Sequence, residues 1–207
     1  MNGKSREEVA AQYAAGAAGW TEQYADPAAY LGHRAELLVS LGPRLEPGDR
    51  VLDLACGDGA LAAYLPGLEY RGVDASREMV EAARLRGVEA ELGDLNDYAP
   101  AGPVAATCVF RAIYYAHDRA AFFRHAASYT ERKLVFDLNP RQYRLDDVRA
   151  ELRAAGLARL DLRPFFVPQT VALPRAAAGA VRAAERSGPA ARLALRFRFT
   201  YLCAASR

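Results

Sequence analysis

Short apolar runs alternate with amphipathic helical patterns through the middle of this 207-residue chain. The strand-like runs are Arg50–Leu54, Tyr70–Val73, Ala90–Leu92, Ala105–Phe110 and Lys133–Leu138. The helical patterns are Ala60–Leu65, Arg77–Arg86, Arg119–Tyr129 and Leu145–Ala155. Strands that alternate with helices at this spacing form parallel sheets with helices on both faces. We therefore predict an α/β fold with a doubly wound, mostly parallel sheet.

The segments on either side of this alternation have a different character. Two helices are expected before it: Glu7–Ala18, and a second that begins at Asp26-Pro27, where Asp26 can cap and Pro27 can take the first helical position. After it, the strand-like stretches Leu160–Val167 and Leu193–Ala204 enclose an Ala-rich helix between Pro174 and Gly188. These last two strands suit an antiparallel pair at the sheet edge, so we expect seven strands with the last one antiparallel.

Composition excludes several classes of function. The net charge is only +2, far from the basic footprint of a nucleic-acid-binding protein. Cys56, Cys108 and Cys203 are widely scattered, so neither a disulfide framework nor a zinc site is expected. The chain shows no apolar run of about 20 residues and no signal-peptide pattern, which favours a cytoplasmic protein that does not cross a membrane.

A glycine-rich turn follows the first predicted strand. Gly57-Asp58-Gly59-Ala60-Leu61-Ala62 fits the loose pattern G-x-G-x-x-G/A, which usually places a pyrophosphate at a helix N-terminus. Asp53 and Asp58 argue against that ligand, because each like-charge contact at about 4–6 Å costs on the order of a few kcal/mol. A ligand with a cationic centre and no phosphate, such as S-adenosylmethionine (SAM), fits this turn better.

Three motifs in order resemble those of class I SAM-dependent methyltransferases. They are Asp53-Leu54-Ala55-Cys56-Gly57-Asp58-Gly59, Gly72-Val73-Asp74-Ala75-Ser76 and Gly93-Asp94-Leu95. Ala55 departs from the pattern, because the family often has glycine there. The resemblance covers roughly residues 50–139. It implies a Rossmann-like fold, SAM as the methyl donor and S-adenosylhomocysteine (SAH) as the product.

The resemblance also implies roles for individual residues. Asp74 would accept hydrogen bonds from the ribose hydroxyls, Asp94 would bind the adenine amino group, and Met79 would pack on the adenine face. The full set of expected cofactor-binding residues is Asp53, Ala55, Gly57, Gly59, Asp74, Ala75, Met79, Asp94, Leu95 and Arg111. The chain would form a single domain, with residues 1–45 as an N-terminal helical lid, 46–140 as the cofactor-binding core and 168–190 as a helical insertion.

The second substrate is expected beyond the carboxyl ends of the fourth and fifth strands. Tyr24, Tyr114, Tyr115 and Arg141 are the residues expected to bind it. The N-terminal helices supply further aromatic and basic residues: Tyr13, Trp20, Tyr24, Tyr30, His33 and Arg34. Methyl transfer needs a base only when the nucleophile starts protonated. The candidates for a base are His33 and Asp137, with His117 a weaker one because Asp118 beside it reads as a helix cap.

We thus expect a methyltransferase that acts on an O or N nucleophile of a small molecule, as a monomer or homodimer, without a metal. Two alternatives stay open: an NAD(P)-binding oxidoreductase, which the loose glycine pattern and Asp74 would tolerate, and a SAM-binding protein without catalytic activity. Asn139-Pro140 partly matches a motif of enzymes that methylate DNA amino groups. It follows the fifth strand instead of the fourth and lacks the second proline, so that interpretation is disfavoured.

Overall fold

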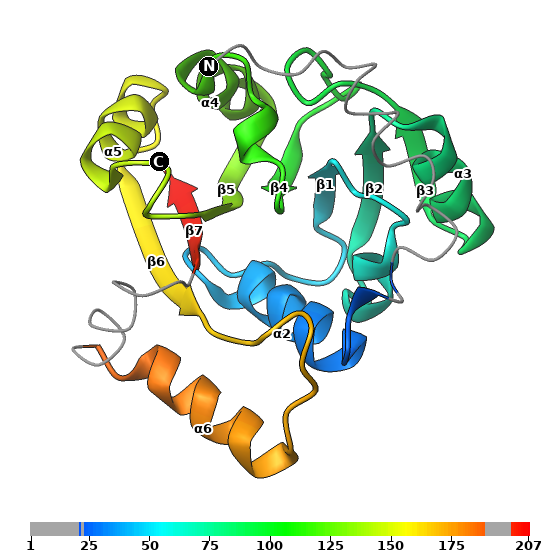
Figure 1. Cartoon of the computed structure of the whole chain (residues 1–207). Coiled ribbons are helices and arrows are strands. Elements are labelled where there is room, and N and C mark those ends of the chain that lie inside the picture. Colours follow the sequence, from blue (N-terminus) through cyan, green and yellow to red (C-terminus); the bar gives the residue numbers. More distant parts are fainter. Residues whose placement is uncertain (1–20, 22, 189–199) are drawn as a thin grey trace.

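A seven-stranded sheet forms the centre of the molecule (Figure 1). The structure is a computed structural model that describes residues 21, 23–188 and 200–207. The strand order is β3-β2-β1-β4-β5-β7-β6. Neighbouring strands among β1 to β5 pair in parallel, and β7 is antiparallel to both β5 and β6. The predicted fold class is confirmed, including the single antiparallel strand at the end of the chain.

The elements follow the predicted alternation closely. The strands are β1 (Arg50–Leu54), β2 (Glu69–Asp74), β3 (Glu89–Leu92), β4 (Val104–Val109), β5 (Thr130–Leu138), β6 (Arg159–Phe165) and β7 (Thr200–Ser206). The helices are α2 (Pro27–Ser40), α3 (Arg77–Leu85), α4 (Arg119–Tyr129), α5 (Leu145–Ala154) and α6 (Arg175–Arg186), with the short 3-10 helices η2 (Ala60–Tyr64) and η3 (Ile113–Tyr115).

Sequence reasoning misjudged one helix type. The segment predicted as the helix Ala60–Leu65 is the five-residue 3-10 helix η2. Pro66 follows at once and disfavours the helical conformation at Leu65, so the segment has no room for regular α-helical turns. The predicted helix Glu7–Ala18 and the first part of the predicted strand Leu193–Ala204 lie outside the described residues.

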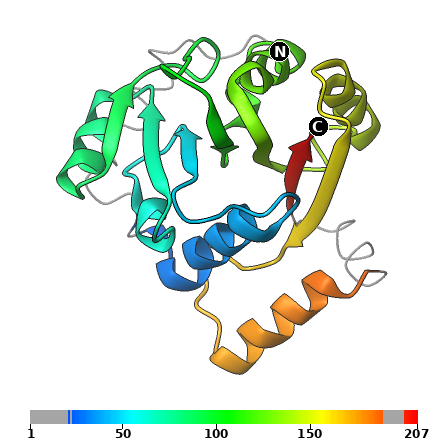
Figure 2. The same ribbon diagram turned by 180° about the vertical axis from the view of Figure 1, so that it is seen from behind.

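Apolar side chains on alternate strand positions separate the core into two layers. On one face, Val51, Cys108 and Val135 pack with residues of α2 and η2. On the other face, Leu52 and Phe136 pack with residues of α4 and α5. Figure 2 shows α2 crossing one face of the sheet. None of the described helices is both long and apolar enough to cross a bilayer.

Helix α2 is fixed at both ends. At its start, the Asp26 carboxylate accepts a hydrogen bond from the Ala29 amide at 2.9 Å, with Pro27 in the first helical turn as predicted. At its end, Lys133 of β5 donates from Nζ to the carbonyls of Val39 at 3.1 Å and Leu41 at 2.8 Å. A buried ammonium thus satisfies carbonyls that the helix itself leaves unpaired.

Helix α6 lies to one side of the sheet, beyond the end of β6 and next to α2 (Figures 1 and 2). The predicted helix between Pro174 and Gly188 is therefore present. It is attached through the buried carboxylate of Glu185, which contacts Nε2 of His33 at 2.5 Å and accepts the Phe166 amide at 2.7 Å. The division of the chain into lid, core and insertion stays a prediction.

Candidate active site

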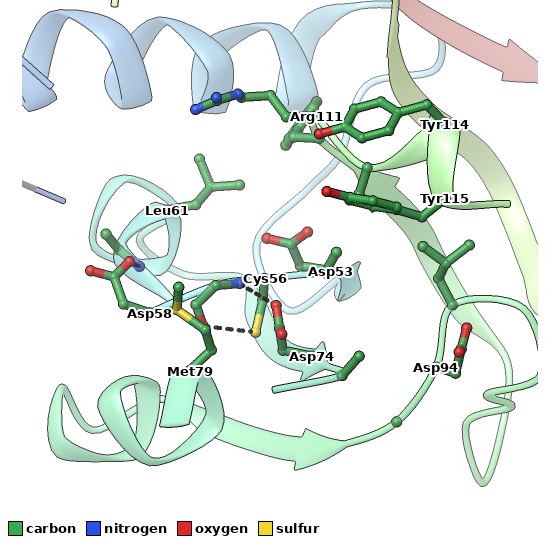
Figure 3. Close-up of a pocket in the computed structure, with 18 of the residues that line it drawn as sticks. Asp53, Cys56, Asp58, Leu61, Asp74, Met79, Asp94, Arg111, Tyr114 and Tyr115 are labelled. Atoms are coloured by element: carbon green, nitrogen blue, oxygen red, sulfur yellow. Dashed lines mark hydrogen bonds between the residues drawn. The ribbon is translucent and has the colours of Figure 1, made fainter. Parts of the chain in front are cut away.

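A pocket opens at the carboxyl ends of β1, β2, β3 and β4 and is covered from one side by α2. This is the usual ligand crevice of a doubly wound sheet. Figure 3 shows Asp74 and Met79 on one side of the space and Arg111 and Tyr114 on the opposite side. The lining residues are Tyr24, Leu31, Arg34, Asp53, Ala55, Cys56, Gly57, Asp58, Ala60, Leu61, Asp74, Ala75, Met79, Gly93, Asp94, Leu95, Asn96, Phe110, Arg111, Ala112, Tyr114, Tyr115 and His117.

The turn after β1 is built from left-handed backbone conformations. Ala55, Gly57 and Gly59 have φ angles of 64°, 57° and 68°. Glycine adopts these values without steric cost, whereas Ala55 pays for its Cβ at the position where the related family often has glycine. The turn exposes backbone to the pocket, because Ala55 and Gly57 both line it.

Asp74 at the end of β2 is held in one orientation by backbone amides. Its Oδ2 accepts from Gly57 N and its Oδ1 from Ser76 N, both at 2.9 Å. Burial raises the pKa of its carboxyl, and these amide hydrogen bonds lower it. Each oxygen keeps a further lone pair, so the carboxylate can accept two more hydrogen bonds from a ligand in the pocket.

Asp53 in β1 is a buried carboxylate with one oxygen unused. Its Oδ2 accepts from the Tyr70 hydroxyl at 2.6 Å, whereas Oδ1 has no hydrogen-bond partner among the described residues. Burial raises the pKa of Asp53 to about 6, although the Tyr70 hydrogen bond opposes this rise. Because Asp53 lines the pocket, a cationic or donor group of a ligand would relieve its desolvation.

Asp58 would repel a phosphate group less than the sequence analysis assumed. Its buried carboxylate pairs with Nη2 of Arg86 at 2.9 Å and also accepts from the Thr21 hydroxyl. The Arg86 guanidinium compensates the charge of Asp58, so Asp58 does not repel a phosphate as strongly as an unpaired carboxylate would. The electrostatic argument against a dinucleotide then depends mainly on Asp53.

The predicted adenine-binding residues all line the pocket. Met79 is 2% exposed on α3, and its amide donates to the capping Ser76 hydroxyl at 3.3 Å. Asp94 accepts from the amide and the side-chain nitrogen of Asn96, at 2.9 and 2.7 Å. Ala75 and Leu95 complete this part of the lining. Their roles in adenine binding stay predictions.

The loop after β4 brings Arg111 and two tyrosines to the pocket. Arg111 has the left-handed φ of 57°, and its amide donates to Oδ1 of Asp137 at 2.6 Å. The rings of Tyr114 and Tyr115 are 4.4 Å apart and tilted by 50°. Tyr24 lines the pocket from the segment before α2. Three of the four predicted acceptor-binding residues therefore line the pocket, and Arg141 does not.

Four predicted site residues do not line the pocket. His33 faces away from it, with Nε2 on Glu185 and Nδ1 on Glu36 at 3.2 Å, so we do not retain it as a base. The Asp137 carboxylate lies behind the pocket wall, where it holds the Arg111 amide. Arg141 is exposed on the loop after β5. Gly59 lies against Ala83 and Val88 behind the turn.

Sequence reasoning left several lining residues without a role. Asn96 and Phe110 gave no motif signal, although Asn96 lies four residues after the predicted strand Ala90–Leu92 and Phe110 ends the predicted strand Ala105–Phe110. Arg34 was considered only because related methyltransferases sometimes place an arginine of this segment on the carboxylate of the cofactor, and it was not chosen as a site residue. His117 does line the pocket, at an exposed position where its amide donates to Asn96 Oδ1 at 2.9 Å.

Sequence and structure comparisons agree with this geometry. Residues 51–133 match a family described as a methyltransferase domain. A trans-aconitate 2-methyltransferase of Mycobacterium tuberculosis (strain ATCC 25177 / H37Ra) is 45% identical in an alignment of 84 residues that covers 36% of this chain and 32% of that protein. The matched region thus spans about a third of the length of this curated relative. The family match at residues 51–133 includes the turn after β1 and the ends of β2 and β3.

The whole fold is shared with solved structures of low sequence identity. Magnesium protoporphyrin IX methyltransferase (ChlM) from Synechocystis PCC 6803 with bound SAM has a TM-score of 0.64 at 18% identity, over 98% of this chain and 97% of that one. The [4+2]-cyclase SpnF has a TM-score of 0.64 at 17% identity, over 100% and 97%. The fold therefore serves more than one kind of reaction, and the similarity to a methyltransferase domain depends on residues 51–133. Residues 51–133 are thus similar to a methyltransferase domain, and the whole chain shares its fold with SAM-dependent methyltransferases such as ChlM.

Proposed function

We propose that the protein transfers a methyl group from SAM to an oxygen or nitrogen of a small molecule and releases SAH. The observation that carries this proposal is the fixed carboxylate of Asp74 at the pocket rim, oriented by the amides of Gly57 and Ser76. A diol such as ribose matches two carboxylate oxygens that each have a lone pair to spare. The family match favours this function over an NAD(P)-dependent oxidoreductase.

The other carboxylates suit the remaining parts of SAM. Asp53 offers its unpaired oxygen to the amino-acid end, where the ligand carries an ammonium and the nearby sulfonium. Asp94 and Met79 lie where the adenine ring would bind, as the resemblance implies. The aromatic rings of Tyr114 and Tyr115 offer an apolar surface on the acceptor side of the pocket.

The protein's own contribution to the reaction is alignment. SAM supplies a methyl group already activated by its positively charged sulfur. The acceptor's lone pair forms the new bond to carbon while the carbon–sulfur bond breaks and its electron pair stays on sulfur. The pocket walls hold the two reactants in line and exclude water, which is where most of the acceleration comes from. The small-molecule acceptor is supported by the trans-aconitate 2-methyltransferase named above.

Calorimetry with SAH and NAD tests the proposal. We expect SAH to bind and NAD not to bind. Asp74→Ala should weaken SAH binding by roughly 1–3 kcal/mol, because the ribose hydroxyls lose their acceptor. Asp97→Ala is the matched control, since Asp97 is exposed and does not line the pocket. Measurable NAD affinity without SAH affinity would refute the cofactor assignment.

An activity assay tests the transfer itself. The formation of SAH from SAM is measured with trans-aconitate and with a panel of small alcohols, amines and acids. We expect acceptor-dependent SAH release that Asp74→Ala reduces and Asp97→Ala leaves unchanged. SAH binding together with no turnover on any acceptor would favour the non-catalytic SAM-binding alternative.

A further inference from the structure

Asn96 lies on the loop after β3 and contacts a second loop that lines the pocket. It is itself a lining residue, two positions after Asp94 and outside the three cofactor motifs. The second loop follows β4 and contains η3, which carries Tyr114 and Tyr115. Figure 3 shows Asp94 and these two tyrosines on the same side of the pocket. The side chain of Asn96 lies where the two loops meet.

On its own loop, Asn96 orients the carboxylate of Asp94. Oδ1 of Asp94 accepts from the backbone amide of Asn96 at 2.9 Å and from its side-chain nitrogen, Nδ2, at 2.7 Å. The second donor fixes the carboxylate, because a group held by one hydrogen bond can still rotate about it. Both donors use Oδ1, which leaves Oδ2, within the described part of the chain, to a ligand in the pocket.

On the other loop, the same side-chain amide pairs with the backbone on either side of Ala116. Nδ2 of Asn96 donates to the Tyr115 carbonyl at 3.4 Å, and its Oδ1 accepts from the His117 amide at 2.9 Å. Tyr115 is the last residue of η3, where a helix leaves its carbonyls without a partner of its own. Asn96 therefore holds the end of the helical turn that carries the two tyrosines.

An amide side chain fits this set of partners, and a carboxylate or a hydroxyl does not. Nδ2 faces two acceptors, the Asp94 carboxylate and the Tyr115 carbonyl, whereas Oδ1 faces a donor, the His117 amide. These partners fix which end of the amide is the nitrogen. An aspartate at this position would place a second negative charge beside Asp94 and would supply no donor.

We infer that Asn96 is a positioning residue that links adenine recognition to the acceptor side of the pocket. The inference rests on the proposed function, which supplies the adenine-bearing ligand. Asn96 orients Asp94 so that Oδ2 can accept from the adenine amino group. It also holds the end of η3, so that Tyr114 and Tyr115 line the acceptor side. One side chain, which contacts no reacting atom, thus aligns the surroundings of both ligands.

Affinities for two nucleosides test the first role. SAH has the adenine amino group, whereas S-inosylhomocysteine has an oxygen in its place and offers Asp94 no amino donor there. We expect the unaltered protein to bind SAH at least about 10-fold more tightly. Asn96→Ala should lower SAH affinity about 5-fold, the effect of one hydrogen bond, and change S-inosylhomocysteine affinity less than about 2-fold. Asp97→Ala is the control from the same loop, because Asp97 is exposed and does not line the pocket.

Amide hydrogen exchange tests the second role. In Asn96→Ala the His117 amide loses its acceptor, so we expect it to exchange about 5-fold faster, while the buried strand β4 exchanges at an unchanged rate. Asn96→Asp separates the two roles. Its carboxylate can still accept from the His117 amide but has no donor for Asp94, so this variant should keep the protection of His117 and lose the preference for SAH.

Three outcomes would overturn the inference. One is an equal loss of affinity for SAH and S-inosylhomocysteine in Asn96→Ala, which a purely structural role would produce. The others are an unaltered protein that binds the two nucleosides equally and a His117 amide whose exchange does not respond to Asn96→Ala. If Asn96→Ala fails to fold, Asn96→Asp supplies both measurements. Failure of the proposed function shows separately, as absent SAH binding in the unaltered protein.

Discussion

The two sides of helix α2 use buried charge in different ways. On the side facing α6, His33 has a carboxylate within reach of each ring nitrogen, Glu185 at 2.5 Å and Glu36 at 3.2 Å. On the pocket side, Arg34 has two nitrogens without a partner and Asp53 has one such oxygen among the described residues. A satisfied buried pair holds the fold together, whereas unsatisfied groups in a cleft indicate a ligand.

The largest expected effect is a loss of stability on the side of α2 that faces α6. Glu185→Ala should lower the free energy of unfolding by about 3–5 kcal/mol, because it leaves His33 and the Phe166 amide without their buried acceptor. Urea denaturation measures the loss. SAH affinity in the folded variant should stay unchanged.

Glu36→Ala is the control for this prediction. Glu36 is 40% exposed, and exposed ion pairs contribute about 1 kcal/mol or less. A loss of stability as large as that of Glu185→Ala would contradict the comparison, and so would a loss of SAH affinity in either variant.

The next prediction concerns Asp53, whose replacement should raise the free energy of unfolding at neutral pH instead of lowering it. Its pKa is raised from 3.8 to about 6, so the folded protein holds this proton more tightly than the unfolded chain does. The contribution of Asp53 to stability is then fully present below about pH 4 and is lost as pH rises through 6. At pH 7 the ionised group costs the unliganded protein about 3 kcal/mol.

Asp53→Asn should remove this cost. We expect the variant to gain up to about 3 kcal/mol of stability at pH 7 and almost nothing at pH 4, while SAH binding weakens. Denaturation at several pH values, with Asp97→Asn as control, measures the difference. A gain that does not depend on pH would show that ionisation is not its cause.

Asp137→Asn should lower the free energy of unfolding by a smaller amount than Glu185→Ala. The amide oxygen of asparagine can still accept from the Arg111 amide, but the charge that pairs with Arg34 is lost. A hydrogen bond to a charged group contributes about 2 kcal/mol, so we expect a loss of that size in urea denaturation. If Asp137 were instead the catalytic base, stability would change little and turnover would collapse.

The smallest effect is expected at Ala55. Its φ of 64° strains the backbone of any residue with a Cβ, and glycine relieves that strain. Ala55→Gly should raise stability by about 1 kcal/mol after the entropy of the more flexible unfolded chain is subtracted. SAH affinity should change little. A marked loss of SAH affinity would show that the Ala55 methyl group itself contacts the ligand.

Much of the fold could be predicted because local patterns of apolar and polar residues determine where the strands and helices form. The β1 range Arg50–Leu54 and the α4 range Arg119–Tyr129 were predicted to the residue. The 3-10 form of η2 was missed because the helical signal of Ala60–Leu65 was read without the constraint that Pro66 imposes.

The site was predictable only where it follows strand ends. Asp53, Asp74 and Asp94 come directly from motifs at the ends of consecutive strands, and all three line the pocket. His33 faces α6 and Arg34 faces the pocket because their partners are Glu185 and Asp137, respectively. Both partners are more than 100 residues away in sequence. No local pattern carries that information, because adjacent residues of an amphipathic helix look alike until their partners are known.

Lys133 of β5, which binds carbonyls at the end of helix α2, can report local opening of the structure. Lys133 is fully buried, and burial lowers its pKa to about 8; Lys4, the chain's other lysine, lies outside the described residues. An acylating reagent can reach the buried amine of Lys133 only when the structure around the C-terminal end of α2 opens. The rate at which Lys133 is labelled in the native protein therefore reports how often that end of the helix opens.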